Sequence, residues 1–184
     1  MNRNRGLALA VAGVVVAAAA WFYFRPRTDR VAIDLIKEFP TAKQKRPSDE
    51  SFTIVDATLN GETRKSIAFT GTTRIRWQIT VPDNGLLRVS LGIKEEAWKE
   101  QGADGVTFYI HVSDGANADD ALFKTTVNPA GVPADRRWQD IELDLSQYAG
   151  ESVELNFNTY TSVGGGNNAI GDLGLWGEPR VVVR

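Results

Sequence analysis

From Phe52 onward, apolar and polar residues alternate with a period of two in a series of short segments. This alternation places successive side chains on opposite faces of a strand, so each segment is predicted to bury one face, as strands of antiparallel sheets do. Turn-forming residues separate the segments, among them Asn60, Gly61 and residues 82–85. The predicted strands are residues 52–59, 64–70, 73–81, 86–93, 105–113, 121–127, 141–145 and 153–157.

Many short strands at regular spacing, with almost no helix, predict an all-β domain over residues 51–184. The expected architecture is a jelly-roll β-sandwich. Trp77, Trp138 and Trp176 lie in strand-like segments and are expected in its core. The length of this region suits one domain with a sizeable core.

Residues 6–24 form the longest apolar stretch and contain no charged residue. As a helix they would measure roughly 28 Å, close to the hydrocarbon thickness of a bilayer. Four aromatic residues end the stretch, and Arg25 and Arg27 follow. We therefore predict a single transmembrane helix. Two alternatives remain: a cleaved signal peptide, with Ala18 and Ala20 before the cut, and a buried core helix.

The short basic tail at residues 1–5 is expected in the cytoplasm, because a long domain behind such a tail is typical of a signal anchor. The predicted location is the inner or plasma membrane, with the C-terminal domain periplasmic or extracellular. The absence of cysteine fits export but also any other compartment. Ala8, Ala12 and Gly13 are small residues at helical spacing, so this face is expected to contact another membrane helix.

Residues 25–50 read as a connector that contains one short amphipathic helix over residues 29–39. Val31, Leu35 and Phe39 lie four residues apart and would form one apolar stripe, and Pro40 ends the pattern. Leu35 and Phe39 are the expected contacts with a partner protein. Packing of the stripe on the chain's own domain or on the bilayer surface are the alternatives.

Three runs carry a resemblance to a known family: residues 104–112 (DGVTFYIHV), 138–153 (WQDIELDLSQYAGESV) and 174–181 (GLWGEPRV). They resemble the galactose-binding-like jelly rolls, which include bacterial carbohydrate-binding modules. Within the second run, Leu145 and Tyr148 are expected to plug the end of the sandwich, and Gly150 to supply a backbone angle that other residues avoid. The resemblance implies a fold and carries over no sugar-binding residue, because these modules bind through variable loops.

Trp98 is the candidate ligand-binding residue, because it is surrounded by charge in a segment that breaks the strand pattern. A tryptophan that caps the core is the alternative. The glycine-rich residues 163–172 either shape a ligand pocket or reverse the chain. Asp114, Asp119 and Asp120 carry oxygens that suit calcium, but their spacing matches no defined calcium loop. No motif calls for a cofactor.

Catalysis has little support in the sequence. His111 is the one histidine, no cysteine is present, and neither a nucleophile elbow nor a metal-binding histidine pair occurs. Beyond residue 27 the chain holds 17 basic residues (21 less four) against 23 acidic ones, which disfavours nucleic-acid binding. Paired carboxylates of a glycan-processing enzyme remain a third possibility.

The first functional hypothesis is therefore a non-catalytic, membrane-anchored accessory subunit. Its exported sandwich would bind and stabilise a larger membrane protein complex, with the lipid bilayer and other membrane subunits as partners. The alternative is a membrane-tethered carbohydrate-binding module. Its partner would be a glycan.

Overall fold

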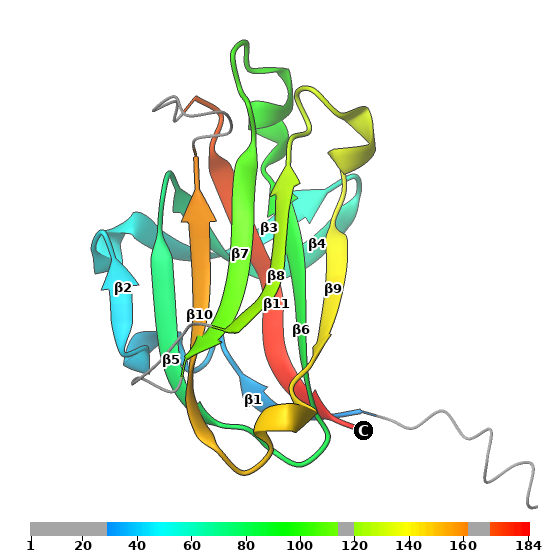
Figure 1. The fold of residues 1–184 in the computed structure, drawn as a ribbon. Coiled ribbons are helices and arrows are strands. Elements are labelled where there is room, and N and C mark those ends of the chain that lie inside the picture. Colours follow the sequence, from blue (N-terminus) through cyan, green and yellow to red (C-terminus); the bar gives the residue numbers. More distant parts are fainter. Residues whose placement is uncertain (1–28, 114–119, 162–169) are drawn as a thin grey trace, which may run out of the picture.

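The computed structural model describes residues 29–113, 120–161 and 170–184, which form two antiparallel sheets packed face to face (Figure 1). The predicted β-sandwich is confirmed. The tail at 1–5 and the predicted membrane helix at 6–24, with Ala8, Ala12 and Gly13, lie outside the described residues. Within the described residues, no helix combines the length and apolar character needed to span a membrane.

The first sheet, here called sheet A, has the strand order β3-β4-β11-β6-β9, and β1 pairs with the far half of β11. The long strand β11 therefore contacts three neighbours. The strands of sheet A are β1 (Arg30–Asp34), β3 (Phe52–Leu59), β4 (Glu62–Thr70), β6 (Gly85–Ile93), β9 (Gln139–Asp144) and β11 (Leu173–Val183).

The second sheet, sheet B, has the order β2-β5-β10-β7-β8. Its strands are β2 (Gln44–Arg46), β5 (Arg74–Thr80), β7 (Val106–Ser113), β8 (Asp120–Val127) and β10 (Ser152–Tyr160). The helices of the described residues are short 3-10 turns: η1 (Phe39–Thr41), η2 (Asp49–Ser51), η3 (Glu95–Lys99), η4 (Pro133–Asp135) and η5 (Ser146–Tyr148).

The strands predicted from alternation agree with the observed strands to within a few residues at each end. The turns between them are confirmed by their backbone angles. Asn60 and Gly61, with φ of 50° and 82°, join β3 to β4, and Asn84, with φ of 54°, precedes β6. Gly150 has a φ of 79°, as expected for the turn between β9 and β10.

The helix predicted over residues 29–39 is wrong. Residues 30–34 form β1 and pair antiparallel with β11, and β2, also within the predicted connector, pairs with β5. An eleven-residue helix would be marginal alone, whereas β11 offers a free line of backbone hydrogen-bonding groups. Two of the three stripe residues pack on the sandwich itself: Leu35 is 0% exposed, and the ring of Phe39 lies edge-on to that of Phe52 at 5.7 Å. The third, Val31, is exposed.

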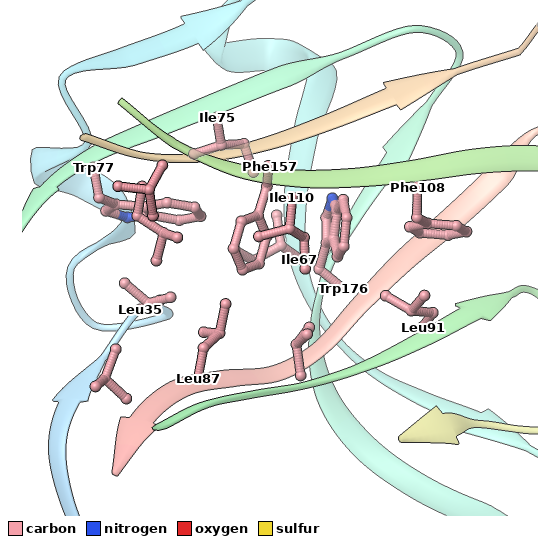
Figure 2. Close-up of a cluster of buried hydrophobic side chains, with 14 of the residues drawn as sticks. Leu35, Ile67, Ile75, Trp77, Leu87, Leu91, Phe108, Ile110, Phe157 and Trp176 are labelled. Carbon is pink, nitrogen blue, oxygen red and sulfur yellow. The ribbon is translucent and has the colours of Figure 1, made fainter. Parts of the chain in front are cut away.

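The core between the sheets is organised around Trp176, on the inner face of β11 (Figure 2). Its ring centroid lies 4.8 Å from that of Phe108 on β7 and 4.6 Å from that of Phe157 on β10. The pair with Phe108 is edge-to-face and the pair with Phe157 is tilted. Aromatic pairs of this kind add to the free energy of apolar burial. Because both phenylalanines belong to sheet B, Trp176 connects the centres of the two sheets.

The expected core residues are confirmed. Trp77 is buried beside Phe157, and Leu145 and Tyr148 close the end of the same cluster. Trp138 is also buried, but it belongs to a second, smaller cluster. This cluster lies on the opposite face of β11, because Leu175 projects away from Trp176 in the strand.

Glycines make room for Trp138 on this outer face of sheet A. A Cβ at Gly177 of β11 would lie 2.8 Å from Trp138 Cζ3, and one at Gly92 of β6 would lie 3.1 Å from it. The indole N–H of Trp138 donates a hydrogen bond to the carbonyl oxygen of Glu62 at 2.9 Å. The outer face thus has an apolar, covered half beside Trp138 and an open half further along the strands.

The buried position of Leu35 generates a stability prediction. Leu35→Ala should lower the free energy of unfolding by about 2–5 kcal/mol, because it deletes buried methyl groups and leaves a cavity. Val31→Ala is the matched control, because Val31 lies in β1, four residues before Leu35, and its side chain is 51% exposed. It should change stability by no more than about 0.5 kcal/mol. Urea unfolding of both variants measures the difference, and equal effects would contradict the placement of Leu35.

Candidate functional site

The open half of the outer face of sheet A carries a groove of about 390 Å³. Strands β4, β6, β9 and β11, which are neighbours in the sheet, supply its lining. The side chains that line it are mostly charged or polar: Glu62, Thr63, Arg64, Arg88, Val89, Ser90, Asp140, Ile141, Glu142, Glu178 and Arg180. A second hollow of about 520 Å³ continues it toward β1 and shares Arg88, Glu178 and Arg180.

Arg64 occupies the end of the groove nearest the covered half. Its guanidinium group lies over the Trp138 ring at 5.4 Å from the centroid and donates to Glu62, Ser90 and Asp140. Ser90 in turn donates its hydroxyl to Asp140 Oδ1 at 2.7 Å. The Arg64 side chain is only 13% exposed, so its position is fixed by packing as well as by ion pairing.

Arg88 lies in the middle of the groove and is held by acidic residues from two directions. Its Nε donates to Glu142 Oε2 at 2.8 Å, and its guanidinium also pairs with Asp29 at 2.5 Å. Arg180 on β11 is the cross-strand partner of Arg88. Like charges directly opposite each other repel, and the carboxylate of Glu178, 2.8 Å from Arg180, offsets this repulsion.

Glu178 reaches this position through an irregularity of β11. The register between β11 and β6 shifts between Gly177 and Arg180, and Glu178 has a φ of 42°, in the left-handed region. A bulge of this kind re-aims side chains. Here it places Glu178 at the point where the two hollows meet.

Two acidic residues of the groove, Asp140 and Glu142, favour the ionised state. The hydrogen bond from Arg64, with smaller contributions from Ser90, lowers the pKa of Asp140. The hydrogen bond from Arg88 and the charge of Arg184 lower the pKa of Glu142. Near neutral pH the groove therefore presents fixed anionic acceptors beside fixed cationic donors. Such a surface suits a ligand with many hydroxyl groups, because each hydroxyl both donates and accepts hydrogen bonds.

Trp98, the ligand-binding residue predicted from the sequence, does not line this groove. It is half-buried, donates its indole N–H to the carbonyl oxygen of Ile93 at 2.8 Å, and packs against both apolar clusters. These contacts match the alternative, a tryptophan that caps the core. Its role in binding stays a prediction.

Two aspartates lie in the segments that lead into β7 and β11, and both strands begin at the upper end of the sandwich in Figure 1. Asp104 precedes β7, and Asp172, which is 0% exposed, precedes β11. Burial, and secondarily the negative charge of Asp104, raise the pKa of Asp172 to about 7. The sequence did not single out this pair, because two acids some seventy positions apart in loops carry no pattern.

The calcium candidates Asp114 and Asp119 lie outside the described residues. Asp120 begins β8, is exposed, and accepts a hydrogen bond from the Tyr148 hydroxyl at 3.0 Å. In the part of the chain that the structure describes, no group of three or more His, Cys, Asp or Glu side chains is placed to hold a metal. His111 is buried on β7, with Nε2 3.0 Å from Asn158 Nδ2.

The groove residues were also missed by sequence reasoning. Arg64, Arg88, Asp140 and Glu142 occupy outward positions of their strands, which alternation alone assigns to solvent. A usable signal was present in β6 and β9, where Arg88 and Glu142 each lie between two apolar residues. This local pattern does not reveal the strand order that brings the groove residues together.

No protein-family model matches the chain. An uncharacterized protein of Archaeoglobus fulgidus is 32% identical over 134 residues, which is 73% of this chain and 31% of that protein. The chain thus spans about a third of that relative's length.

Solved structures with the same fold include family 51 carbohydrate-binding modules (CBM51) of Clostridium perfringens. The module of GH95, solved with methyl-galactose, has a TM-score of 0.55 and 15% identity, covering 76% of this chain and 93% of that one. A ZmpB structure that combines the M60 catalytic domain with two such modules has a TM-score of 0.58 and 12% identity, covering 84% of this chain and 15% of that one. A second ZmpB structure, of the CBM51-2 module with GlcNAc, has a TM-score of 0.54 and 16% identity, covering 77% of this chain and 30% of that one. At these identities the likeness establishes the fold alone.

The lowered pKa values of Asp140 and Glu142 generate a prediction about acid stability. Groups with a lowered pKa in the folded state contribute stability above their unfolded pKa, about 3.9 for Asp and 4.3 for Glu, and lose it as the pH falls through the folded pKa. The double variant Asp140→Asn, Glu142→Gln should therefore lose less stability than the wild type between pH 5 and pH 2.

Thermal unfolding across this pH range tests the prediction. Asp56→Asn serves as control, because it changes an exposed carboxylate on β3 outside the groove. It should retain the wild-type dependence on pH. Parallel curves for the double variant and the wild type would contradict the assigned ion network.

Proposed function

We propose that the sandwich is a non-catalytic carbohydrate-binding module and that the groove on sheet A is its binding site. The observation that carries the proposal is the alternation of fixed guanidinium and carboxylate groups across four adjacent strands, in a groove of about 390 Å³. Such alternation matches the paired donors and acceptors of sugar hydroxyls. The fold likeness to carbohydrate-binding modules supports the proposal.

In this proposal Asp140 and Glu142 accept hydrogen bonds from sugar hydroxyls, and Arg88 and Arg180 donate to sugar oxygens. An ionised carboxylate has about four lone-pair sites, so Asp140 can keep its bonds to Arg64 and Ser90 while it accepts another. These side chains are already held by one another. Little conformational entropy is lost when a ligand arrives, which favours affinity.

The predicted membrane helix at residues 6–24 would make this a tethered module, with the sandwich outside the cytoplasm. This location is part of the proposal and rests on the sequence. The same fold likeness favours carbohydrate binding over the accessory-subunit hypothesis, to which it adds no support.

Binding of the full chain to a glycan array, followed by calorimetry on the glycans retained, tests the proposal. Asp140→Ala and Arg180→Ala should each weaken affinity by about tenfold or more, since hydrogen bonds to charged groups contribute about 1.5–3 kcal/mol. Asp56→Ala on β3 should leave affinity unchanged.

Two outcomes would overturn the assignment. If no glycan binds the wild type, the function is wrong. If Trp98→Ala abolishes binding while Asp140→Ala and Arg180→Ala do not, carbohydrate binding stands but the site lies at the loop end of the sandwich.

A further inference from the structure

Five strands lie at the edges of the two sheets: β1, β2, β3, β8 and β9. An edge strand presents unpaired backbone N–H and C=O groups, and native proteins usually block it with short length, charge, proline or a bulge. Four of the five edges carry such features. β1 is short and has a bulge in its pairing with β11, and β2 has three residues and is followed by Pro47. β8 has a bulge in its pairing with β7, and β9 carries three acids in six residues.

The fifth edge strand, β3, lacks these protections. It has eight residues, and all of them pair with β4 in one unbroken register. It contains no proline, its one charged residue is Asp56, and the side chain of Ile54 is 37% exposed. Among the residues that the structure describes, no strand pairs with the outer edge of β3. An edge strand of this form accepts a further strand from another chain.

The turn at residues 60–61 determines which backbone groups of β3 point to the free edge. The residues that flank a two-residue turn, Leu59 and Glu62, form a hydrogen-bonded pair. Because such pairs alternate along a strand, odd-numbered residues of β3 bond to β4 and even-numbered residues point away from it. Phe52 agrees with this assignment, because its N–H donates to the carbonyl oxygen of Asp49, outside the sheet. The residues that present N–H and C=O groups at the free edge are therefore Ile54, Asp56 and Thr58.

We propose that β3 pairs antiparallel with β3 of a second copy of this chain, about a two-fold axis at Ala57. Residues opposite each other in a sheet share a face, so the axis must pass through a residue and not between two. With the axis at Ala57, this residue faces its own copy in a pair without hydrogen bonds. Asp56 then lies opposite Thr58 of the second copy, and these two residues exchange backbone hydrogen bonds.

The one charge of the strand selects this axis. An axis at Asp56 would place two carboxylates directly opposite each other, and like charges in that position are unfavourable. An axis at Val55 would place Asp56 opposite the apolar side chain of Ile54. The axis at Ala57 avoids both arrangements.

The axis at Ala57 also gives the carboxylate of Asp56 a partner on each side. On its own sheet Asp56 is the cross-strand partner of Lys65. Across the new contact it faces the hydroxyl of Thr58, which lies 2.7 Å from the hydroxyl of Thr63 in its own chain. A hydroxyl can accept one hydrogen bond while it donates another, so Thr58 can accept from Thr63 and donate to Asp56. The two-fold axis repeats this row, and the contact is self-complementary.

The contact does not depend on carbohydrate binding, because the groove lies on β4, β6, β9 and β11. It would join the two copies of sheet A into one continuous sheet. An axis perpendicular to that sheet keeps the outer faces of both copies on the same side. The dimer would therefore present two copies of the groove in one direction, as a bivalent surface.

Single cysteines test this contact in the full chain, held in mild detergent, because the chain has no cysteine of its own. Ala57→Cys should form a disulfide-linked dimer on mild oxidation, seen on a non-reducing gel. Opposite residues in a pair without hydrogen bonds have Cα atoms about 4.5 Å apart, which is within disulfide range. Val55→Cys, on the same strand and face, is the matched control. Its two copies would lie about 14 Å apart along the strand and should give only background linkage.

The charge at residue 58 tests the same axis independently. In the Ala57→Cys chain, Thr58→Asp adds two pairs of opposed carboxylates to each dimer and should lower the yield of linked dimer about fivefold or more. Thr58→Lys places a cation opposite Asp56 and should maintain or raise the yield. Thr58 is exposed, so both variants should fold. If Ala57→Cys does not fold, light scattering of the two residue-58 variants without the cysteine provides the same comparison.

Three results would overturn the proposal. A wild-type chain that is monomeric by light scattering at all concentrations has no such contact. Equal linkage of Ala57→Cys and Val55→Cys would show that the copies associate through another part of the chain. Equal yields of linked dimer from Thr58→Asp and Thr58→Lys would show that Asp56 does not face residue 58.

Discussion

The contact of Trp176 with Phe108 and Phe157 is the constraint on which the rest of the molecule depends. It joins the central strand of sheet A to the two central strands of sheet B through rings whose centroids are less than 5 Å apart. Each aromatic ring buries a large apolar area, and such rings dominate core energetics. This cluster sets the separation and alignment of the two sheets. The positions of the groove on sheet A and of the loops at the end of the sandwich depend in turn on the sheets.

The alternation of side chains along β11 also determines what lies on the outer face of sheet A. Since Trp176 points inward, Gly177 must point outward, and its lack of a side chain lets Trp138 lie against the sheet. Arg64 then covers Trp138 and connects to Asp140 across the sheet. The covered tryptophan offers no open aromatic face for stacking on a sugar. A glycan in the groove would therefore depend on hydrogen bonds to charged groups for most of its affinity.

The strands could be predicted from the sequence because alternation is a local signal, clear in segments such as residues 73–81 and 153–157. The segment 29–39 misled, because Val31, Leu35 and Phe39 satisfy a helical period while Val31, Ile33 and Leu35 also satisfy a strand period. The segment forms a strand because the backbone of β11 is available to pair with it. That strand is more than a hundred residues away in the sequence, so no local pattern could reveal it.

The candidate sites were beyond prediction for a related reason. The groove needs Arg64, Arg88, Asp140 and Arg180 on neighbouring strands, but the order β4-β11-β6-β9 is not sequential. The Asp104–Asp172 pair needs the burial of a loop residue, which short-range patterns do not report. Where the sequence did single out a residue by its unusual surroundings, as with Trp98, the structure shows that the surrounding charges flank a residue that packs on the core.

The place of β11 in sheet A also affects how the domain can be made. This strand pairs with β1, β4 and β6, yet a ribosome delivers it after every one of them. Until residues 173–183 emerge, β4 and β6 lack the neighbour that joins them, and Trp176 is missing from the core. Sheet A therefore cannot close progressively during synthesis. The nascent chain exposes unpaired strand edges until β11 emerges, and during this stage aggregation competes with folding.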